Sequence, residues 1–436
     1  MNSNSAKSFF AVVSLCAVVS ATDAAGEGKV LRPEFEKTGH VPPQTTTPEP
    51  RSSGREYVDL AVMVVALGIA AWLSLKVRSR RGIVMVSLVC LAYFGFFRKG
   101  CVCPVGSFQN IINAFTDSEY AIPLAVTGFF LLPLIFALFF GRVFCGAVCP
   151  LGAVQDVVLL RPVKAPRGLS HILEMVPFVY LGLAVMFVAC GAGYIVCRYD
   201  PFVGFFRLGG GPGMLAFGAF LLLLGVFAGR PYCRFLCPYG VLLGWMSVLS
   251  KYHASITPDE CIECRLCSDA CPFDAISAPS PEKNPEPRDQ SVKRLFTLAL
   301  LLPALAVSLG WLGSLTGKPL SRFHRTVSLA DQVRGENTGK LSYATFDSDK
   351  FREMKGASEE LFAEASQIED RFVKSGWFLG GFLGIVFSVK LIALSLSWKR
   401  EGYQPDRRRC FSCGRCFDSC PKERIKRAPA GREMMP

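Results

Sequence analysis

The chain has 436 residues, 51% of them hydrophobic, and a formal net charge of +13. In so apolar a chain, a basic excess is typical of lysine and arginine at the cytoplasmic ends of membrane helices, so we expect no nucleic-acid binding. None of the four histidines lies deep inside an apolar run, so we expect no haem held by imidazole ligands within the membrane. They are His40, His171, His253 and His324.

The first 54 residues have the features of an exported N-terminus. Residues 1–26 contain a single early charge, Lys7, then an apolar stretch of about a dozen residues and the small pair Ala24-Ala25, which is typical of a signal peptide. Residues 27–54 are polar and rich in Pro and Thr, and we expect them to form an extracytoplasmic linker.

Seven apolar runs predict an all-α polytopic membrane protein that begins outside the cytoplasm. The runs cover residues 57–75, 82–97, 121–140, 172–196, 213–229, 295–313 and 376–397. Basic residues follow the first run (Lys76, Arg78) and the third run (Arg161, Lys164), which places these loops in the cytoplasm. The sequence therefore predicts a protein of the bacterial inner membrane, in contact with lipid, with a cytoplasmic C-terminus.

The pattern G-R-x-x-C-x-x-x-C-P-x-G occurs twice, from Gly141 to Gly152 and from Gly229 to Gly240. Proline after the second cysteine suits the first turn of a helix, whose N-terminus favours an anionic sulfur. Together the copies offer four thiolates, enough for an iron–sulfur cluster, although a disulfide or a copper or redox-thiol site would use the same residues. The four are Cys145, Cys149, Cys233 and Cys237. The neighbouring Arg142, Arg230 and Arg234 either stabilise a negatively charged cluster or act as cytoplasmic anchors.

Three further cysteines, Cys101, Cys103 and Cys197, follow outward-going spans. Cys103 is followed by Pro104, and Asp200-Pro201 takes the corresponding place after Cys197. These cysteines predict an outer metal or cluster site, with Asp200 or Cys190 as a candidate fourth ligand. A disulfide is the alternative, because the outer compartment is oxidising.

Two runs read C-x₂-C-x₂-C-x₃-C-P, the bacterial ferredoxin pattern for [4Fe–4S] clusters, and a structural zinc site is the less favoured alternative. The first run holds Cys261, Cys264, Cys267 and Cys271, and the second holds Cys410, Cys413, Cys416 and Cys420. In two-cluster ferredoxins the fourth cysteine binds the other cluster. We therefore expect one cluster on the first three cysteines of the first run with Cys420, and another on the first three of the second run with Cys271.

These patterns divide the chain into eight expected segments. They are a signal peptide (1–26), an extracytoplasmic linker (27–54), a five-helix membrane core with the duplicated unit (55–250), a first cytoplasmic ferredoxin-like segment (251–293), a transmembrane helix (294–313), an extracytoplasmic segment (314–375), a second transmembrane helix (376–397) and a second ferredoxin-like segment (398–436). We expect the two ferredoxin-like segments to meet below the membrane as one two-cluster α+β domain.

From about residue 57 to residue 421, these motifs resemble the NosR/NapH group of membrane polyferredoxins. The stretch from Lys390 to Pro421, with Tyr403-Gln404-Pro405-Asp406 before Cys410, is especially similar to NosR. Residues 27–54 are too short for the flavin-binding domain of NosR, and residues 314–375 lack its attachment motif, so the resemblance places any flavin on a partner.

The resemblance implies electron transfer across the membrane rather than a stand-alone catalyst. It implies a cytoplasmic reductant or quinol as donor, and an extracytoplasmic flavin- or copper-containing protein as acceptor. Two [4Fe–4S] clusters in the ferredoxin runs, with further clusters at the C-x-x-x-C-P and outer cysteines, would carry the electrons. The alternative is a metal-handling or assembly factor that uses its clusters to reduce copper for an extracytoplasmic enzyme.

Overall fold

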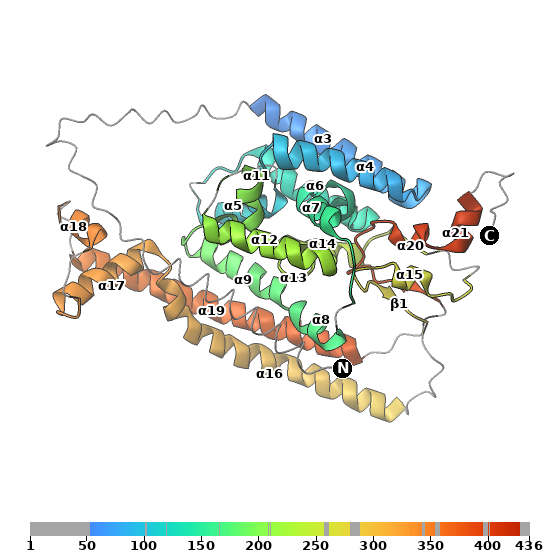
Figure 1. Cartoon of the computed structure of the whole chain (residues 1–436). Helices are drawn as coiled ribbons and strands as arrows, with labels where there is room; N and C mark the ends of the chain where they lie inside the picture. The colour runs from blue at the N-terminus through green and yellow to red at the C-terminus, as the bar shows by residue number, and fades with distance from the viewer. Residues whose placement is uncertain are drawn as a thin grey trace.

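The computed structural model describes residues 53–427, apart from 101–102, 119, 165, 208, 210, 257–260, 280–287, 342–344, 354–357, 396–399 and 401. The expected signal peptide, most of the expected linker and Cys101 lie outside these residues. The described chain is mostly helical: a central bundle is flanked by a long helical hairpin, and the cysteine-rich segments lie together at one end (Figure 1). We call this end the motif end.

The bundle is built from many short helices rather than a few long ones. Its helices are α3 (Ser53–Trp72), α4 (Arg80–Cys90), α5 (Pro104–Thr116), α6 (Leu124–Phe140), α7 (Pro150–Val158), α8 (Arg167–Leu173), α9 (Val176–Ala189), α10 (Ile195–Tyr199), α11 (Pro201–Arg207), α12 (Pro212–Phe227), α13 (Pro231–Phe235) and α14 (Pro238–Val248). Three π-helical turns, η1 (Leu73–Val77), η2 (Leu91–Phe97) and η3 (Phe144–Val148), extend α3 and α4 and precede α7.

Five stretches of the described chain are long and apolar enough to cross a membrane. They are Gly54–Val77, Arg80–Phe97, Gly168–Ala189, Val292–Ser321 and Ser358–Ser395. α6 and α12 occupy the places of the third and fifth expected spans but have only 17 and 16 residues. The fourth expected span, 172–196, ends at Ala189, because Gly191 and Gly193 take left-handed φ values of 75° and 100°. The structure thus supports a membrane protein with five candidate spans.

Two long helices, α16 (Arg288–Ser321) and α19 (Ser358–Ser395), form the hairpin beside the bundle (Figure 1). Glycines let their backbones touch: a Cβ added at Gly384 would lie 2.6 Å from the Leu305 carbonyl oxygen, and one at Gly317 would lie 2.6 Å from Val373 Cα. Small residues at a crossing are typical of helices that pack within a membrane. α19 also packs against α9, which attaches the hairpin to the bundle.

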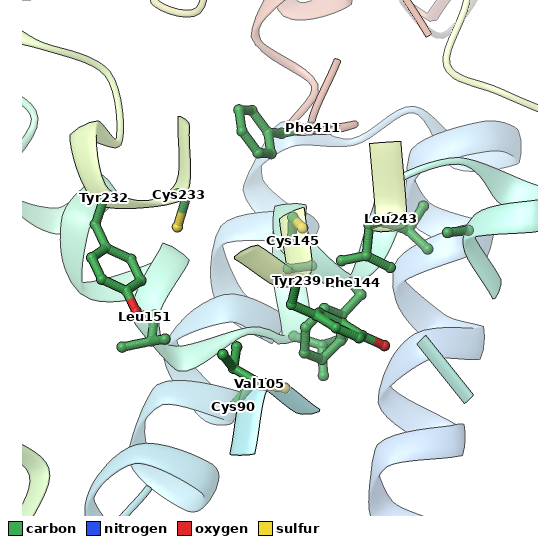
Figure 2. Close-up of a cluster of buried hydrophobic side chains, with 14 of the residues drawn as sticks. Cys90, Val105, Phe144, Cys145, Leu151, Tyr232, Cys233, Tyr239, Leu243 and Phe411 are labelled. Carbon is green, nitrogen blue, oxygen red and sulfur yellow. The ribbon is translucent and has the colours of Figure 1, made fainter. Parts of the chain in front are cut away.

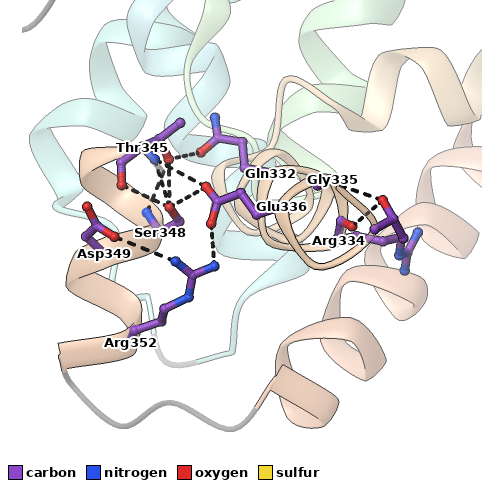
Figure 3. Close-up of polar contacts among 9 residues, drawn as sticks. Gln332, Arg334, Gly335, Glu336, Thr345, Ser348, Asp349 and Arg352 are labelled. Atoms are coloured by element: carbon purple, nitrogen blue, oxygen red, sulfur yellow. Dashed lines mark hydrogen bonds and ion pairs between the residues drawn. The ribbon is translucent and has the colours of Figure 1, made fainter. Parts of the chain in front are cut away.

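At the end of the hairpin away from the motif end, α17 (Arg325–Asn337) and α18 (Phe346–Glu353) are held together by a polar network (Figure 3). Glu336 Oε1 accepts a hydrogen bond from Ser348 Oγ at 2.6 Å, and the same carboxylate pairs with Arg352. Thr345 Oγ1 donates to Gln332 Oε1 at 2.9 Å. These helices belong to the segment 314–375 that the sequence predicts outside the cytoplasm.

The two cysteine-rich segments meet at the motif end through a small antiparallel sheet. β1 (Ile276–Ser277) pairs with β2 (Gln404–Pro405), and Ile276 lies opposite Pro405. Three short helices complete this region: α15 (Leu266–Asp269), α20 (Arg415–Asp418) and α21 (Pro421–Arg427). The segments come together as the sequence predicts, but the described sheet has two strands of two residues each, far less β structure than the expected α+β domain implies.

The hairpin crossing generates a test of packing. A Cβ at Gly380 would overlap the carbonyl oxygen of Leu309, whereas one at the adjacent Gly381 would lie 3.6 Å from the Ala306 oxygen, an ordinary contact. We expect Gly380→Ala to destabilise the protein by about 1–3 kcal/mol through overpacking. Gly381→Ala is the matched control and should gain up to about 1 kcal/mol from helix propensity. Thermal unfolding in detergent measures both, and equal midpoints would contradict this packing.

Candidate iron–sulfur sites

Three helices of the bundle begin at a Cys-Pro pair, and a fourth begins at Asp-Pro. Cys103, Cys149 and Cys237 are the N-caps of α5, α7 and α14, and proline follows each of them in the first helical turn. Asp200 directly precedes α11. The helix starts predicted after the two C-x-x-x-C-P motifs are confirmed. Because a helix N-terminus carries partial positive charge, the three Cys-Pro starts favour anionic sulfur at these positions.

The four helix starts surround one cavity with an empty volume of about 660 Å³. All four cysteines of the duplicated motif line it: Cys145, Cys149, Cys233 and Cys237. Figure 2 shows Cys145 and Cys233 between Phe411 on one side and Val105 and Cys90 on the other. The structure therefore brings the two motif copies to a single site, which we call the inner site.

Two polar side chains contact the sulfurs of the inner site. Arg142 Nη2 lies 3.7 Å from Cys145 Sγ, and Gln155 Nε2 donates to Cys233 Sγ at 3.2 Å. Gln155 Oε1 accepts from the backbone N–H of Tyr232 at 3.0 Å, which fixes the orientation of the amide. Donors of this kind stabilise sulfur in its anionic form.

The chemistry of the inner site fits an iron–sulfur cluster. Burial, and then the charges of the neighbouring thiolates, raise the pKa of Cys149 and Cys237 well above the ordinary value of a thiol. Burial therefore favours the neutral thiols, and thiolates at this site would need a compensating cation, which the iron of a four-cysteine cluster would supply. Within the described ranges, no three His, Cys, Asp or Glu side chains are placed to hold a single metal ion.

Two residues of the predicted outer site share a cavity with the inner site, and Cys101 lies outside the described residues. Cys103 and Asp200 line the same cavity as the inner site, because α5 and α11 start within the bundle. Cys197 lies nearby: a Cβ added at Gly106, in the first turns of α5, would be 3.4 Å from its sulfur. Cys103 and Cys197 are free thiols. We call Cys103, Cys197 and Asp200 the outer group.

The two candidate fourth ligands of the outer group have different surroundings. Asp200 is 3% exposed; its Oδ1 accepts from the Phe202 N–H at 2.9 Å and its Oδ2 from Tyr232 Oη at 3.0 Å. Cys190 instead packs in a separate apolar cluster with Phe187 and donates to Ser375 Oγ at 3.4 Å. Cys190 therefore does not face the cavity that Cys103 lines.

The two ferredoxin runs have the same local backbone. The residues just before and just after the second cysteine take left-handed φ values: Glu263 (51°) and Arg265 (63°) in the first run, Ser412 (53°) and Gly414 (81°) in the second. Left-handed φ is unfavourable for residues other than glycine. Its repetition at matching positions shows that both runs curl in the same way around their cysteines.

The cysteines of the runs fall into two groups across the pair. Burial raises the pKa of Cys267 to about 11, and the charges of Cys261, Cys264 and Cys420 contribute. Burial also raises the pKa of Cys416 well above its ordinary value, and here the contributing charges are those of Cys410, Cys413 and Cys271. Each fourth cysteine is thus near enough to the other run to act on the pKa of its thiols, and its role as a cluster ligand there stays a prediction. The Asp406 N–H, which donates to the Ala275 oxygen at 2.6 Å, holds the runs together.

A larger cavity, with an empty volume of about 1900 Å³, reaches the inner site from the side of α19. Cys233 and Cys237 form part of its wall, and its apolar walls come from α9, α14 and α19. At the motif end it has a polar rim, where Glu174 pairs with Arg409 at 2.9 Å and with Lys390 at 3.2 Å, and where His171 lies 3.8 Å from Glu174. We call it the side cavity.

Several site residues were not predicted from the sequence. Gln155, which donates to Cys233, and Asp156, which pairs with Arg230 at 2.7 Å, follow the first motif copy. The second copy has Leu243 and Gly244 at the equivalent positions, so the repeat itself gives no indication of either role. Phe411 was known only as a spacer between two cysteines, and its contact with the bundle depends on the tertiary fold.

The hydrogen bonds of Asp200 suggest a positioning role rather than cluster ligation. We expect Asp200→Asn to keep the iron content of the native protein, because an amide can still bond Phe202 and Tyr232. We expect Tyr232→Phe, which removes one of these bonds, to cost about 1 kcal/mol of stability without loss of iron. Iron and acid-labile sulfide per chain, together with thermal unfolding, provide the measurement. If Asp200→Asn loses the iron of a whole cluster, Asp200 is a ligand.

Comparison with known proteins supports iron–sulfur binding. A 4Fe-4S binding domain family matches residues 122–167 and 210–255, which contain the two motif copies, and another 4Fe-4S binding domain family matches residues 254–277. The chain is 40% identical over 52 residues to "Putative electron transport protein YccM" of Escherichia coli, which is 12% of this chain and 15% of that protein. It is 27% identical over 102 residues to "Uncharacterized protein MJ0750" of Methanocaldococcus jannaschii, 23% of this chain and 38% of that protein.

These matches are local. The chain spans less than two fifths of the length of either relative. No solved structure matches it significantly. The chain contains 4Fe-4S binding domains, and the domains and the first relative together support a role in iron–sulfur electron transfer.

Proposed function

We propose that the protein is a membrane-bound electron carrier of the NosR/NapH type. It moves electrons between a cytoplasmic or quinol donor and an extracytoplasmic partner that holds flavin or a metal. The observation that carries the proposal is the continuity of the cysteine groups: the first run contacts the second, the second run lies on the inner site, and the inner site shares a cavity with Cys103.

When bound, iron–sulfur clusters supply one-electron carriers at these places, and the chain supplies their separation and surroundings. A bilayer has a hydrocarbon core of about 30 Å, so a conductor needs carriers at more than one depth. The ferredoxin runs lie at the motif end (Figure 1). The cavity of the inner site is lined by residues of the bundle helices α5, α7, α11 and α14. The outer group supports an exit for electrons from this cavity, because Cys103 and Asp200 line the cavity and Cys197 is exposed.

Two places on the molecule are open to a donor. Cys261 and Cys264 are exposed at the motif end, so a soluble reductant can approach the first run directly. The side cavity offers a second route, because it combines apolar walls for a lipid-soluble carrier with a rim of His171 and Glu174 that can accept protons. It also touches Cys233 and Cys237. We propose quinol as the donor at this cavity.

Variants of the inner site test whether electrons held by the ferredoxin runs must pass through this site to reach an acceptor. We expect the double variant Cys145→Ser with Cys233→Ser to keep the EPR signals of the two ferredoxin-run clusters and to lose electron delivery to an extracytoplasmic acceptor. Cys190→Ser is the control, because Cys190 is buried away from the cavity. Normal delivery by the double variant would contradict the proposed path. Metal analysis of the native protein should find more than two [4Fe–4S] clusters and no stoichiometric copper; bound copper would favour the metal-handling alternative.

The side cavity generates a separate test of the donor. We expect Val386→Trp, which adds bulk at the cavity wall, to slow reduction by quinol roughly tenfold, as a steric cost of about 1.4 kcal/mol would. Reduction by dithionite should not change. Phe387→Trp is the control, since Phe387 is adjacent, 42% exposed and outside the cavity wall. Equal quinol rates in both variants would place the donor at the exposed first run instead.

A further inference from the structure

The arginines of the two motif copies are exchanged between the copies. Arg230, from the second copy, donates to the carbonyl oxygens of Cys145 and Gly146 in the first copy, the latter at 3.3 Å. Arg142, from the first copy, lies against the second copy: a Cβ added at Gly240 would be 3.3 Å from its Nη2. Likewise, a Cβ at Gly152 would be 3.0 Å from Arg230 Nη1. The last glycine of each motif thus makes room for the arginine of the other.

Both guanidinium groups lie over one ring of the second ferredoxin run. Arg142 Cζ is 4.3 Å from the ring centroid of Phe411, and Arg230 Cζ is 5.3 Å from it. Arg142 Nη1 also donates to the Arg408 carbonyl at 3.0 Å. A Cβ at Gly146 would overlap the Phe411 carbonyl oxygen, so the backbone of the run sits directly on the first motif copy. Phe411 lies between Cys410 and Cys413 in sequence, so this contact joins the second run to the inner site.

The two exchanged arginines are buried, and they differ in how their positive charges are compensated. Arg230 is fully buried, and its guanidinium pairs with Asp156 at 2.7 Å. Arg142 has no comparable carboxylate within ion-pair distance among the described residues, and it is the arginine that touches Cys145 Sγ. Its positive charge therefore acts on the cysteine sulfur atoms of the inner site. Simple anchoring at a membrane surface would leave both arginines exposed, whereas they are 6% and 0% exposed.

We propose that Arg142 and Arg230 are positioning residues that couple the inner site to the second ferredoxin run, and that the charge of Arg142 raises the reduction potential of the inner site. Reduction of a cluster by one electron adds one negative charge, so a nearby cation stabilises the reduced form. The exchange also explains why each motif copy has an arginine near its start and a glycine at its end, in addition to its cysteines and proline. The inference rests on the proposed function, since it requires clusters at both places.

Potentiometric titration followed by EPR tests the charge. We expect Arg142→Gln to lower the midpoint potential of a cluster signal and to change the magnetic interaction between neighbouring clusters, with iron content unchanged. Arg142→Lys should restore most of the potential, because it keeps the charge. Arg161→Gln removes one exposed cation from the loop after α7 and should have no effect. For Arg230, the variant Arg230→Gln is combined with Asp156→Asn, so that no unpaired carboxylate is left buried.

The glycines provide an independent test of the geometry. The Cβ added by Gly240→Ala meets Arg142 Nη2 most closely, at 3.3 Å, and makes ordinary contacts with Cys233 O and Cys237 Cβ. We expect a smaller shift of the potential in the same direction as Arg142→Gln. Gly402→Ala is the control, since nothing lies within 4 Å of its added Cβ. Unchanged potentials and magnetic interaction in Arg142→Gln and Gly240→Ala, with clusters present, would overturn the inference while leaving the proposed function intact. A native protein without clusters would instead overturn the proposed function.

Discussion

The burial of several thiolates in one cavity is the constraint on which the rest of this structure depends. Sulfur anions in an apolar bundle need positive charge close by, and surface residues cannot supply it. The chain supplies part of this charge with the N-termini of α5, α7 and α14, each placed by a Cys-Pro pair, and with Arg142 at Cys145. These helices are too short to cross a bilayer, but their N-termini meet at the cavity inside the bundle.

The same constraint explains how the cysteine-rich segments are attached. The two ferredoxin runs are separated in sequence by the hairpin α16–α19, yet β1 and β2 pair and Phe411 packs on the first motif copy. The hairpin returns the chain to the motif end at the position where the second run must dock. Its backbone contacts at Gly317 and Gly384 leave little freedom in the crossing of α16 and α19.

Sequence patterns predicted the parts of the site that depend on local geometry. The Cys-Pro helix starts follow from the missing N–H of proline, and the grouping of cysteines across the two runs follows from their spacing. The patterns did not predict those features of the site that depend on tertiary structure. The cavity that Cys103 and Asp200 share with the four motif cysteines was not predicted. Gln155 and Asp156 have no counterparts in the second copy, so the repeat does not indicate their roles. Cys190 was a candidate ligand because it is a cysteine, but it packs in a separate apolar cluster away from the cavity.

The exchange of Arg142 and Arg230 gives a physical reason for duplication. One copy contains two cysteines, and the room beside its last glycine is filled by an arginine that it does not itself provide. A single copy would therefore provide only half of the proposed ligand set. It would leave a space beside Gly152 or Gly240 unfilled, and its arginine would lack the carbonyl groups or the glycine that it packs against. Each copy provides the arginine that the other copy packs against, and both guanidinium groups lie over the ring of Phe411 in the second run. The structural unit is thus the pair of copies rather than either copy alone.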